Sequence, residues 1–546
     1  MKKIVTTILF TGFLASQLFS QCAESTESKV LLVGDSWAFF MSVDGTFNTA
    51  FNNYGHSNYK FLTNATVAEN GAETDDFLTP AKQDEIVRLL NENPSIEVVH
   101  LSIGGNDVLG DWNVSFTQAE TDTLKRQVAD RLLQVITFIK SAKPGIKIVY
   151  SGYCYPNFEE VVTTSAPPFN GSNHPFYSNW ANMGFPTALQ LNNILNDFGD
   201  LMHAYSLADP DVKFYNANAL MQYTHGQLTP LGVAPGGTYP AFTQPMPEGD
   251  PNYPSPKESM RNYLGLTKDC FHLSAKGYLD LIEYNTQKFY QKFLMDDKYY
   301  LSENNSHTGS VSTQGAVSSS LILGNSNSDF YSTVLSFNTT TMKDTTLQKA
   351  SIFLRRESST GQNLVNGNLQ VKVKSGNFGT TVDVEATDYA DGGDASGNPC
   401  IFGANTNGYW VRLDLPSNIL PYITKADTTQ FIISAENISG SSVTFSDASN
   451  PEYAPILNLA YGMLTGISET EAEKNIQIFP NPTNGLLRIE SNNLKIQQIQ
   501  ITDMIGKTMM TSENVKTLDI SGLSEGLYLV SLHTSEGIFS KRIVKE

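Results

Sequence analysis

The chain has 546 residues, of which 40% are hydrophobic and 17% are charged, and its formal net charge is −19. This composition is typical of folded protein, and the length predicts two to four domains. The acidity argues against nucleic acid or an anionic membrane as the partner, because both would repel such a surface.

Residues 1–21 are predicted to be a signal peptide. Lys2 and Lys3 precede an apolar stretch over residues 4–19, and small and polar residues follow it. The stretch is shorter than the roughly 20 apolar residues that a membrane span needs, and no later segment is long and apolar enough. We therefore expect export and no transmembrane segment.

Residues 29–298 alternate strand-like and helix-like patterns, which predicts an α/β domain with a parallel sheet. Apolar runs occupy residues 29–33, 96–103, 146–150 and 212–215, and helical periods such as the one from Leu124 to Ile139 lie between them. Since the runs are continuously apolar, we expect helices to cover both faces of the sheet.

Two of these runs end in residues that suit a reaction site. Ser36 follows the first run and opens a helix-like segment, and helix N-termini favour developing negative charge. Asn106 follows the second run after two glycines, where its amide could donate to an oxyanion. Taken singly, such a serine is usually a helix cap and such an asparagine a turn residue.

A third signal is the pair Asp269 and His272, three residues apart. One short loop could present His272 to Ser36 while Asp269 orients the ring, as nucleophilic catalysis requires. A metal half-site is the alternative, but no second cluster of ligand spacing accompanies the pair, so we expect no metal and no cofactor. A G-x-S-x-G elbow is excluded because Ala38 stands where its last glycine belongs.

Together these segments resemble, in order, the blocks of the SGNH (GDSL) hydrolase superfamily: Gly34-Asp35-Ser36, Gly71, Gly104 to Asp107, and Asp269 to His272. The resemblance implies a flavodoxin-like α/β/α domain of about five parallel strands. It implies Ser36 as the nucleophile, His272 as its base and Asp269 as the acid of the triad. The oxyanion would be held by the N–H groups of Ser36 and Gly71 and by the Asn106 side chain. Gly55 competes with Gly71 for that role.

Two features of this domain stay open. Residues 225–268 are rich in Pro, Gly and Tyr and show no period, which favours a lid or binding loop over a plain surface loop. Cys154 and Cys270 either form a disulfide that pins the triad loop or are two free buried thiols. Cys22 and Cys400 have no evident role.

Residues 305–462 are predicted to be all-β, as a sandwich or jelly roll, because short alternating strands are separated by turns rich in Asn, Ser, Thr and Gly. This stretch, especially its ending at residues 445–457, distantly resembles the carbohydrate-binding jelly-roll modules of secreted proteins. That resemblance implies contact with polysaccharide. A structural spacer is the alternative.

Residues 466–546 form a separate small β module in our interpretation. Four motifs resemble the C-terminal sorting domain of type IX secretion: residues 479–485, 503–507, 523–528 and 541–544. The resemblance implies a small β-sandwich, the type IX machinery as a partner, and a secreted or cell-surface protein. The alternative is a third binding module of immunoglobulin-like shape.

These expectations converge on a secreted carboxylester hydrolase. Acyl lipids are slightly favoured as substrates by the apolar rim that residues 225–268 suggest, and acyl groups on polysaccharide come next because of the middle module. A catalytically silent surface adhesin is a further alternative. The retention of all four blocks argues against it.

Overall fold

The computed structural model describes residues 22, 25–225, 249–303, 306–326, 329–462, 476–491, 496–503, 507–513, 516–534 and 537–546. The chain divides into two compact units, Met1–Tyr461 and Gly462–Glu546. The predicted signal peptide and residues 226–248 of the predicted lid or loop lie outside the described residues.

The first unit contains a five-stranded parallel sheet in the order β2-β1-β3-β4-β5. The strands are β1 (Glu27–Gly34), β2 (Tyr59–Leu62), β3 (Val98–Ser102), β4 (Lys147–Tyr150) and β5 (Val212–Phe214). This is the flavodoxin-like order, in which the carboxyl ends of the strands form the binding edge. The predicted α/β/α fold is confirmed.

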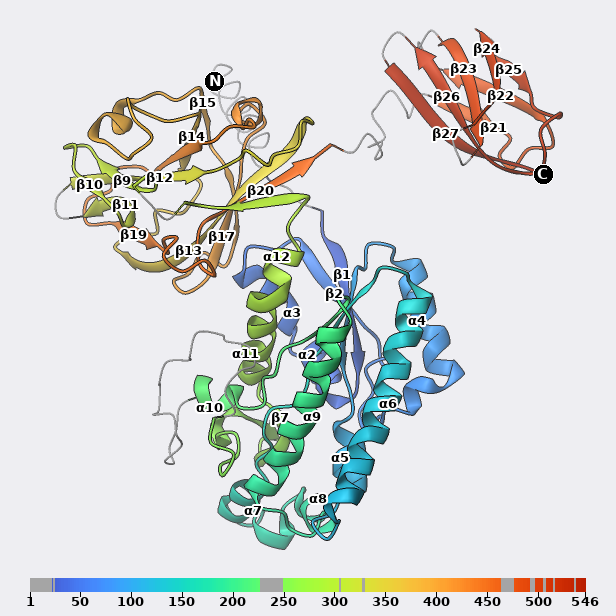
Figure 1. Ribbon diagram of the computed structural model, residues 1–546, viewed down its shortest axis with the longest axis vertical. Helices are drawn as coiled ribbons and strands as arrows, with labels where there is room; N and C mark the ends of the chain where they lie inside the picture. Colours follow the sequence, from blue (N-terminus) through green and yellow to red (C-terminus); the bar gives the residue numbers. More distant parts are fainter. Residues whose placement is uncertain are drawn as a thin grey trace, which may run out of the picture. The chain divides into compact units, whose positions relative to one another are not determined.

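Helices cover both faces of this sheet (Figure 1). One face packs against α4 (Pro80–Glu92), α6 (Gln118–Ala142) and α9 (Ala188–Ala208), and the other against α2 (Ser36–Val43), α3 (Thr46–Asn53) and α11 (Ala275–Asn285). Leu31 and Val33 of β1 face the first set, while Val30 and Leu32 face the second. Because successive strand residues point to opposite faces, both sides of β1 must be apolar.

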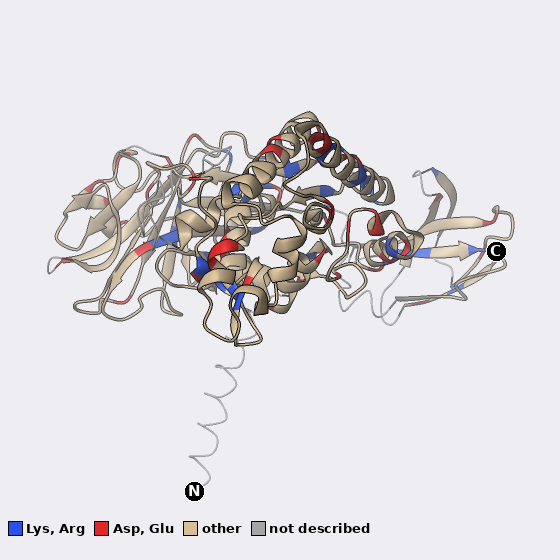
Figure 2. Ribbon diagram, turned by 90° about the horizontal axis from the view of Figure 1, so that it is seen from below, with Lys and Arg blue, Asp and Glu red and all other residues tan. Residues whose placement is uncertain are grey.

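Local signals fix where the long helices begin. Thr117 and Glu120 form a capping box at the start of α6, and Thr187 and Gln190 form one at the start of α9. Ion pairs then join the two helices, from Lys125 to Asp197 and from Lys140 to Asp209, each at 2.6 Å. Elsewhere in the described residues, Lys and Arg likewise lie scattered among Asp and Glu (Figure 2).

Gly34 sets the geometry at the end of β1. Its φ is +154°, and a Cβ there would lie 1.8 Å from the carbonyl oxygen of Ser102 on β3. The absence of a side chain lets the next residue, Asp35, donate its N–H to that oxygen at 3.0 Å. The ends of β1 and β3 are thereby held together just before Ser36 and Asn106.

Shorter elements surround the carboxyl edge of the sheet. They are α5 (Gly105–Asp111), α7 (Glu159–Thr164), α8 (Tyr177–Asn182), α10 (Leu220–Thr224) and a two-stranded hairpin of β6 (Met260–Tyr263) and β7 (Thr267–Leu273). The sequence placed Asp269 and His272 in a loop. The structure differs, because Met260 pairs with Leu273 and draws the segment into a strand.

Antiparallel strands follow in the same unit and confirm the predicted all-β class. They are β8 (Lys298–Leu301), β9 (Gly309–Ser312), β10 (Val317–Ser318), β11 (Leu321–Ser326), β12 (Asp329–Phe337), β13 (Leu347–Thr360), β14 (Gln370–Ser375), β15 (Ala395–Gly397), β16 (Cys400–Gly403), β17 (Trp410–Asp414), β18 (Thr429–Ser434), β19 (Ser442–Phe445) and β20 (Ile456–Tyr461). The long strand β13 pairs with β17 and β20 along its first half and with β19 along its second. The strands on the β17 and β20 side and those on the β19 side share one hydrophobic core. The jelly-roll topology stays a prediction.

The antiparallel part packs directly on the α/β part. Tyr54 and Met295 from the α/β side share a buried cluster with Phe353, Trp410 and Ile456. Lys288 reaches Glu452 at 2.8 Å, and Ala404 donates its N–H to the carbonyl of Asn52 at 3.0 Å. The two parts therefore form one continuous structure.

The cysteines pair differently from what the sequence suggested. Cys22 and Cys400, which have no evident role in the sequence, form a disulfide across 378 residues. Cys154 and Cys270 are free and buried, so the second alternative for this pair is correct. Burial raises the pKa of both thiols, which keeps them protonated at neutral pH.

The second unit is a small sandwich of two antiparallel sheets. One sheet has the order β21 (Ile476–Phe479), β22 (Leu486–Ser491) and β25 (Thr517–Asp519). The other has the order β24 (Thr508–Glu513), β23 (Ile496–Asp503), β26 (Gly526–Thr534) and β27 (Gly537–Lys545). Residues of both sheets share one buried core. Across the described residues of both units, no helix has the length and apolar character to cross a membrane.

Candidate active site

Three side chains from distant segments form a hydrogen-bonded line at the carboxyl edge of the parallel sheet. His272 Nε2 lies 2.7 Å from Ser36 Oγ, and His272 Nδ1 lies 2.9 Å from Asp269 Oδ2. Ser36 is the first residue of α2, and the other two belong to β7. The arrangement can carry a proton from a hydroxyl to an imidazole whose other nitrogen is held by a carboxylate.

The backbone fixes the carboxylate of Asp269. Its Oδ1 accepts the N–H groups of Phe271 at 2.7 Å and His272 at 2.8 Å, so only Oδ2 is left to face the ring. Asp269 is buried, which strengthens these bonds relative to water. The carboxylate is therefore a rigid acceptor for His272 Nδ1–H.

The ring of His272 is also held from the side. The Phe40 ring meets it edge-on at 4.9 Å between centroids. The guanidinium of Arg261 lies 4.1 Å over Phe40 and is paired with Asp44 at 2.7 and 3.2 Å. Because Phe40 and Asp44 extend from the helix that begins at Ser36, this contact chain ties the hairpin to the serine.

Asp35, which sequence reasoning did not select, anchors the turn before the serine. Its Oδ1 accepts the N–H of Trp37 at 2.9 Å, and its Oδ2 accepts the hydroxyl of Tyr153. Burial raises the pKa of Asp35 to about 7, although both hydrogen bonds act against the rise. The place of Asp35 between Gly34 and Ser36 was a usable signal. Nothing local pointed to Tyr153.

Asn106 is bonded to the turn that contains Gly71. The Asn106 side chain donates one N–H to the carbonyl of Ala72 at 2.9 Å, and an amide has a second N–H to give. Gly71, in the turn before Ala72, is exposed and has φ +82°. Ala68, at the start of the same turn, forms a parallel bridge with Gly34, which precedes Ser36 by two residues.

The turn that holds Gly71 is clamped to α5 by a buried carboxylate. Asp107 accepts the N–H of Thr74 at 3.0 Å and also its hydroxyl, and Arg131 lies 3.5 Å from it. Gly55, the competing candidate, lies elsewhere, because a Cβ there would touch Phe353 of β13 at 3.1 Å. Gly71 therefore stays the predicted backbone donor to an oxyanion.

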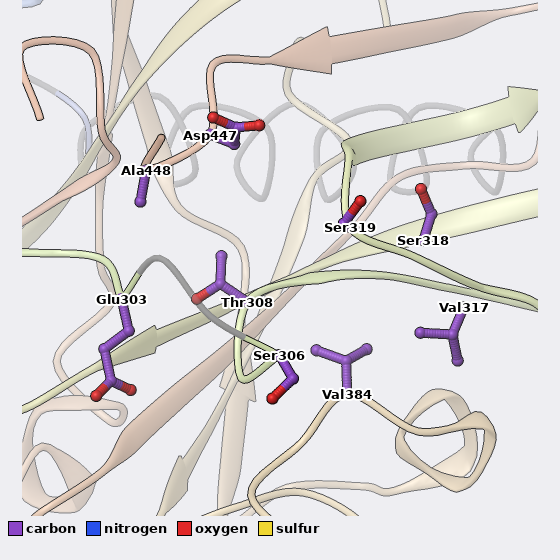
Figure 3. A pocket seen from close by; sticks show the side chains of 9 residues that line it. All are labelled: Glu303, Ser306, Thr308, Val317, Ser318, Ser319, Val384, Asp447 and Ala448. Carbon is purple, nitrogen blue, oxygen red and sulfur yellow. The ribbon is translucent and has the colours of Figure 1, made fainter. Parts of the chain in front are cut away.

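A separate cavity of about 470 Å³ opens in the antiparallel part (Figure 3). Figure 3 shows hydroxyl, carboxylate and aliphatic side chains around it: Glu303, Ser306, Thr308, Val317, Ser318, Ser319, Val384, Asp447 and Ala448. Glu303 is already engaged, since Ser336 donates to it at 2.6 Å. None of the nine described lining residues is aromatic, so the cavity gives no direct support to the predicted polysaccharide contact, which stays a prediction.

The described residues contain no group of three or more His, Cys, Asp or Glu side chains that could hold a metal ion. The hydrogen-bonded line itself contains a hydroxyl, an imidazole and a carboxylate. These groups perform nucleophilic and acid–base chemistry.

Comparison with known proteins identifies the second unit. Residues 477–546 match the family model described as a secretion system C-terminal sorting domain. This unit is a type IX sorting domain. The sorting domain directs the chain to secretion and the cell surface, as the sequence motifs predicted.

No curated protein matches the chain. Three of the similar solved structures are a lipase, Lip_vut3, from a goat rumen metagenome, the extracellular lipase of Streptomyces rimosus and the family 3 carbohydrate esterase of Clostridium thermocellum. Their identities to this chain are 12%, 19% and 14%, and their TM-scores are 0.29, 0.25 and 0.26. The matches cover 48%, 47% and 49% of this chain and 98%, 98% and 99% of those chains.

Proposed function

We propose that this protein is a secreted or surface-bound carboxylester hydrolase in which Ser36, His272 and Asp269 form the catalytic triad. The observation that carries the proposal is the continuous hydrogen-bonded line from Ser36 Oγ to the Asp269 carboxylate. Support also comes from the hydrogen bond that joins Asn106 to the Gly71 turn, and from the bridge between Ala68 of that turn and Gly34, two residues before Ser36.

The reaction proceeds in two halves. His272 Nε2 removes the hydroxyl proton as Ser36 Oγ bonds to the ester carbonyl carbon, and it returns that proton to the leaving alcohol when the C–O bond breaks. Water then attacks the acyl-enzyme by the same route and releases the acid. Asp269 keeps the proton on Nδ1 and stabilises the imidazolium that forms each time.

The oxyanion of each tetrahedral intermediate would lie between the N–H groups of Ser36 and Gly71 and the free N–H of Asn106. Such donors act most strongly where they are fixed before the reaction. Asp107 and Thr74 fix the Gly71 turn, and the Asn106 bond to Ala72 fixes the amide.

Acyl lipids are the substrate class that we favour. Exposed leucine and aromatic side chains lie on the hairpin that carries His272, and such groups suit an apolar ester. Acyl groups on polysaccharide are the second candidate, because the antiparallel part distantly resembles carbohydrate-binding modules. A silent adhesin has no need of a formed triad.

The test is hydrolysis of short-chain p-nitrophenyl esters by Ser36→Ala. We expect kcat to fall by at least about 10⁴-fold while circular dichroism is unchanged, because the nucleophile is lost and the fold is kept. Ser42→Ala, the same change on the same helix, is the matched control. Equal turnover in the wild type and Ser36→Ala would overturn the proposal. A panel of acyl esters of rising chain length against acetylated glycans then separates the two substrate classes.

A further inference from the structure

The hairpin that carries Asp269 and His272 ends in an exposed apolar tip. Leu264 is 78% exposed and Leu266 is 56% exposed, and Tyr263 lies beside them at the end of β6. From Thr267 at the tip, β7 runs five residues to His272, a distance of about 17 Å for an extended strand. The tip is thus joined to the triad by a single strand.

Backbone strain occurs at this tip and at one other exposed apolar residue. Among the described residues, Phe185, Leu264 and Asn405 are the non-glycine residues with positive φ, at 60°, 51° and 51°. Asparagine often adopts this conformation, whereas a bulky Leu or Phe seldom does. Phe185 is 46% exposed and Leu264 is 78% exposed, so burial within the chain covers each strained apolar side chain only in part. Strain at side chains that stay this exposed points to an external partner.

Aromatic contacts connect the two strained residues. The Phe176 ring lies 5.3 Å from Tyr263, the adjacent Tyr177 lies 5.6 Å from Phe185, and Trp180 lies 5.1 Å from Phe185. These rings belong to α8 and its flanks, beside α7 at one end of the α/β part (Figure 1). We call the joined surface the apolar rim: Phe176, Trp180, Phe185, Tyr263, Leu264 and Leu266.

The rim is also free of charge over most of its length. Residues 161–196 contain no Lys, Arg, Asp or Glu, in a chain where 17% of residues are charged and the net charge is −19. On the hairpin, Arg261 is paired with Asp44, and Lys268 donates to the carbonyl of Met260. A partner could therefore cover the rim with little desolvation of charge, which favours an uncharged or zwitterionic surface.

The ring geometry argues for lipid rather than polysaccharide. Phe176 meets Tyr263 at 77° and Trp180 meets Phe185 at 88°, so the rings do not form the flat platform on which a sugar chain stacks. The two leucines offer no hydrogen bond to a hydroxyl. Their aliphatic chains, flanked by Tyr and Trp, suit the boundary between headgroups and acyl chains.

We propose that the apolar rim docks this protein onto the surface of an aggregated, uncharged or zwitterionic lipid ester. The proposal rests on the proposed ester hydrolysis and adds the physical state of its substrate. Docking holds the hairpin, and with it His272, at the lipid surface. The rim acts by binding and takes no part in the chemical step.

Binding is tested in the full chain carrying Ser36→Ala, so that no hydrolysis disturbs the measurement. The probe is phosphatidylcholine vesicles, and the readout is cosedimentation. Adding Leu264→Asn with Leu266→Gln should weaken the vesicle partition coefficient at least about 10-fold, because two aliphatic anchors are lost. Asparagine accepts the left-handed backbone, so the tip keeps its shape.

Leu207→Gln is the matched control for this measurement. Leu207 is 75% exposed and lies near the far end of α9, about 28 Å along the helix from Ala188. Its replacement should leave the partition unchanged. Equal vesicle binding by the double variant and its parent would overturn the proposal. So would rim-dependent retention on insoluble polysaccharide, or a rim-dependent dimer detected by light scattering, without vesicle binding.

A second measurement compares the rate on emulsified tributyrin with the rate on soluble p-nitrophenyl acetate. With Ser36 intact, the double variant should lower the ratio of these rates by about 10-fold, while Leu207→Gln leaves it unchanged. If the wild type hydrolyses neither ester, the proposed function is refuted. The vesicle-binding measurement tests lipid docking by the rim independently of that result. An unchanged ratio in the double variant refutes the role of the rim.

Discussion

Asp35 is a buried carboxyl in contact with the first turn of the helix that begins at Ser36. Its folded pKa of about 7 lies above the ordinary value of 3.8, so the folded state keeps a proton that the unfolded chain releases between about pH 4 and 7. The stabilisation linked to this proton is present below pH 4 and is lost as the pH rises through 7. Above about pH 7, the wild type therefore bears the full free-energy cost of burying the ionised Asp35 carboxylate, and this cost is absent below pH 4.

Asp35→Asn should remove that penalty, since the amide is neutral at every pH and can still accept the N–H of Trp37. The free energy of unfolding of the wild type minus that of the variant should fall by about 4 kcal/mol between pH 4 and pH 8. Urea unfolding at the two pH values measures it. Tyr153→Phe removes a bond that favours the ionised form, so it should raise the pKa of Asp35 further and enlarge the total loss of stability. A difference that does not change with pH would contradict the assignment.

Asn106 has two tasks in the proposed mechanism, and its substitution separates them. Asn106→Ala should lower kcat for soluble esters by about 10²–10³-fold, because one preorganised oxyanion donor is lost. Asn106→Asp has nearly the same shape but places a negative charge against the oxyanion, so its loss should be larger. Steady-state kinetics on p-nitrophenyl acetate measures both. A fall of less than about tenfold in the alanine variant would remove Asn106 from the oxyanion site.

At the scale of elements, the Gly71 turn owes its position to the clamp between Thr74 and Asp107. Thr74→Val keeps the side-chain shape and the backbone donor but removes the hydroxyl bond to a buried carboxylate. We expect the free energy of unfolding to fall by about 1.5–3 kcal/mol, the range for hydrogen bonds to charged groups. Thermal unfolding measures this loss.

Turnover supplies the second readout for this clamp. If it positions Gly71, kcat should fall in Thr74→Val while KM changes little, because the donor matters most for the tetrahedral state. Thr74→Ser retains the hydroxyl and should recover both stability and kcat. A stable but slow Thr74→Ser would show that the methyl group, rather than the bond to Asp107, holds the turn.

At the scale of the whole molecule, the shared cluster makes the α/β and antiparallel parts dependent on each other. Trp410 of β17 is buried against residues of both parts. Trp410→Ala should lower the free energy of unfolding by about 3–5 kcal/mol. The temperature at which esterase activity is lost should then fall together with the temperature at which the antiparallel part unfolds. Calorimetry and residual activity after heating test the coupling. Tyr299→Ala, at an exposed aromatic of β8, is the control. Unfolding of the antiparallel part without loss of activity would show that the two parts melt independently.

Local patterns in the sequence reached a good part of this protein. The apolar runs predicted the strands β1, β3 and β4 because a doubly covered strand must be apolar on both faces. Ser36 and Asn106 were predicted as site residues because each lies three residues after the end of such a run. The sorting-domain motifs were recognisable because each consists of consecutive residues that form a turn. In each case the determining interactions lie within a few residues along the chain.

Tertiary structure decided what depends on distant partners. It placed Tyr153 on Asp35 across 118 residues, joined Cys22 to Cys400 across 378, and moved Gly55 away from the site to Phe353. It also paired Met260 with Leu273, which turned the expected triad loop into a strand, and brought Phe176 to Tyr263 on one exposed surface. Contacts of this kind are chosen by the packing of the whole chain, and they leave no period or spacing in the residues that make them.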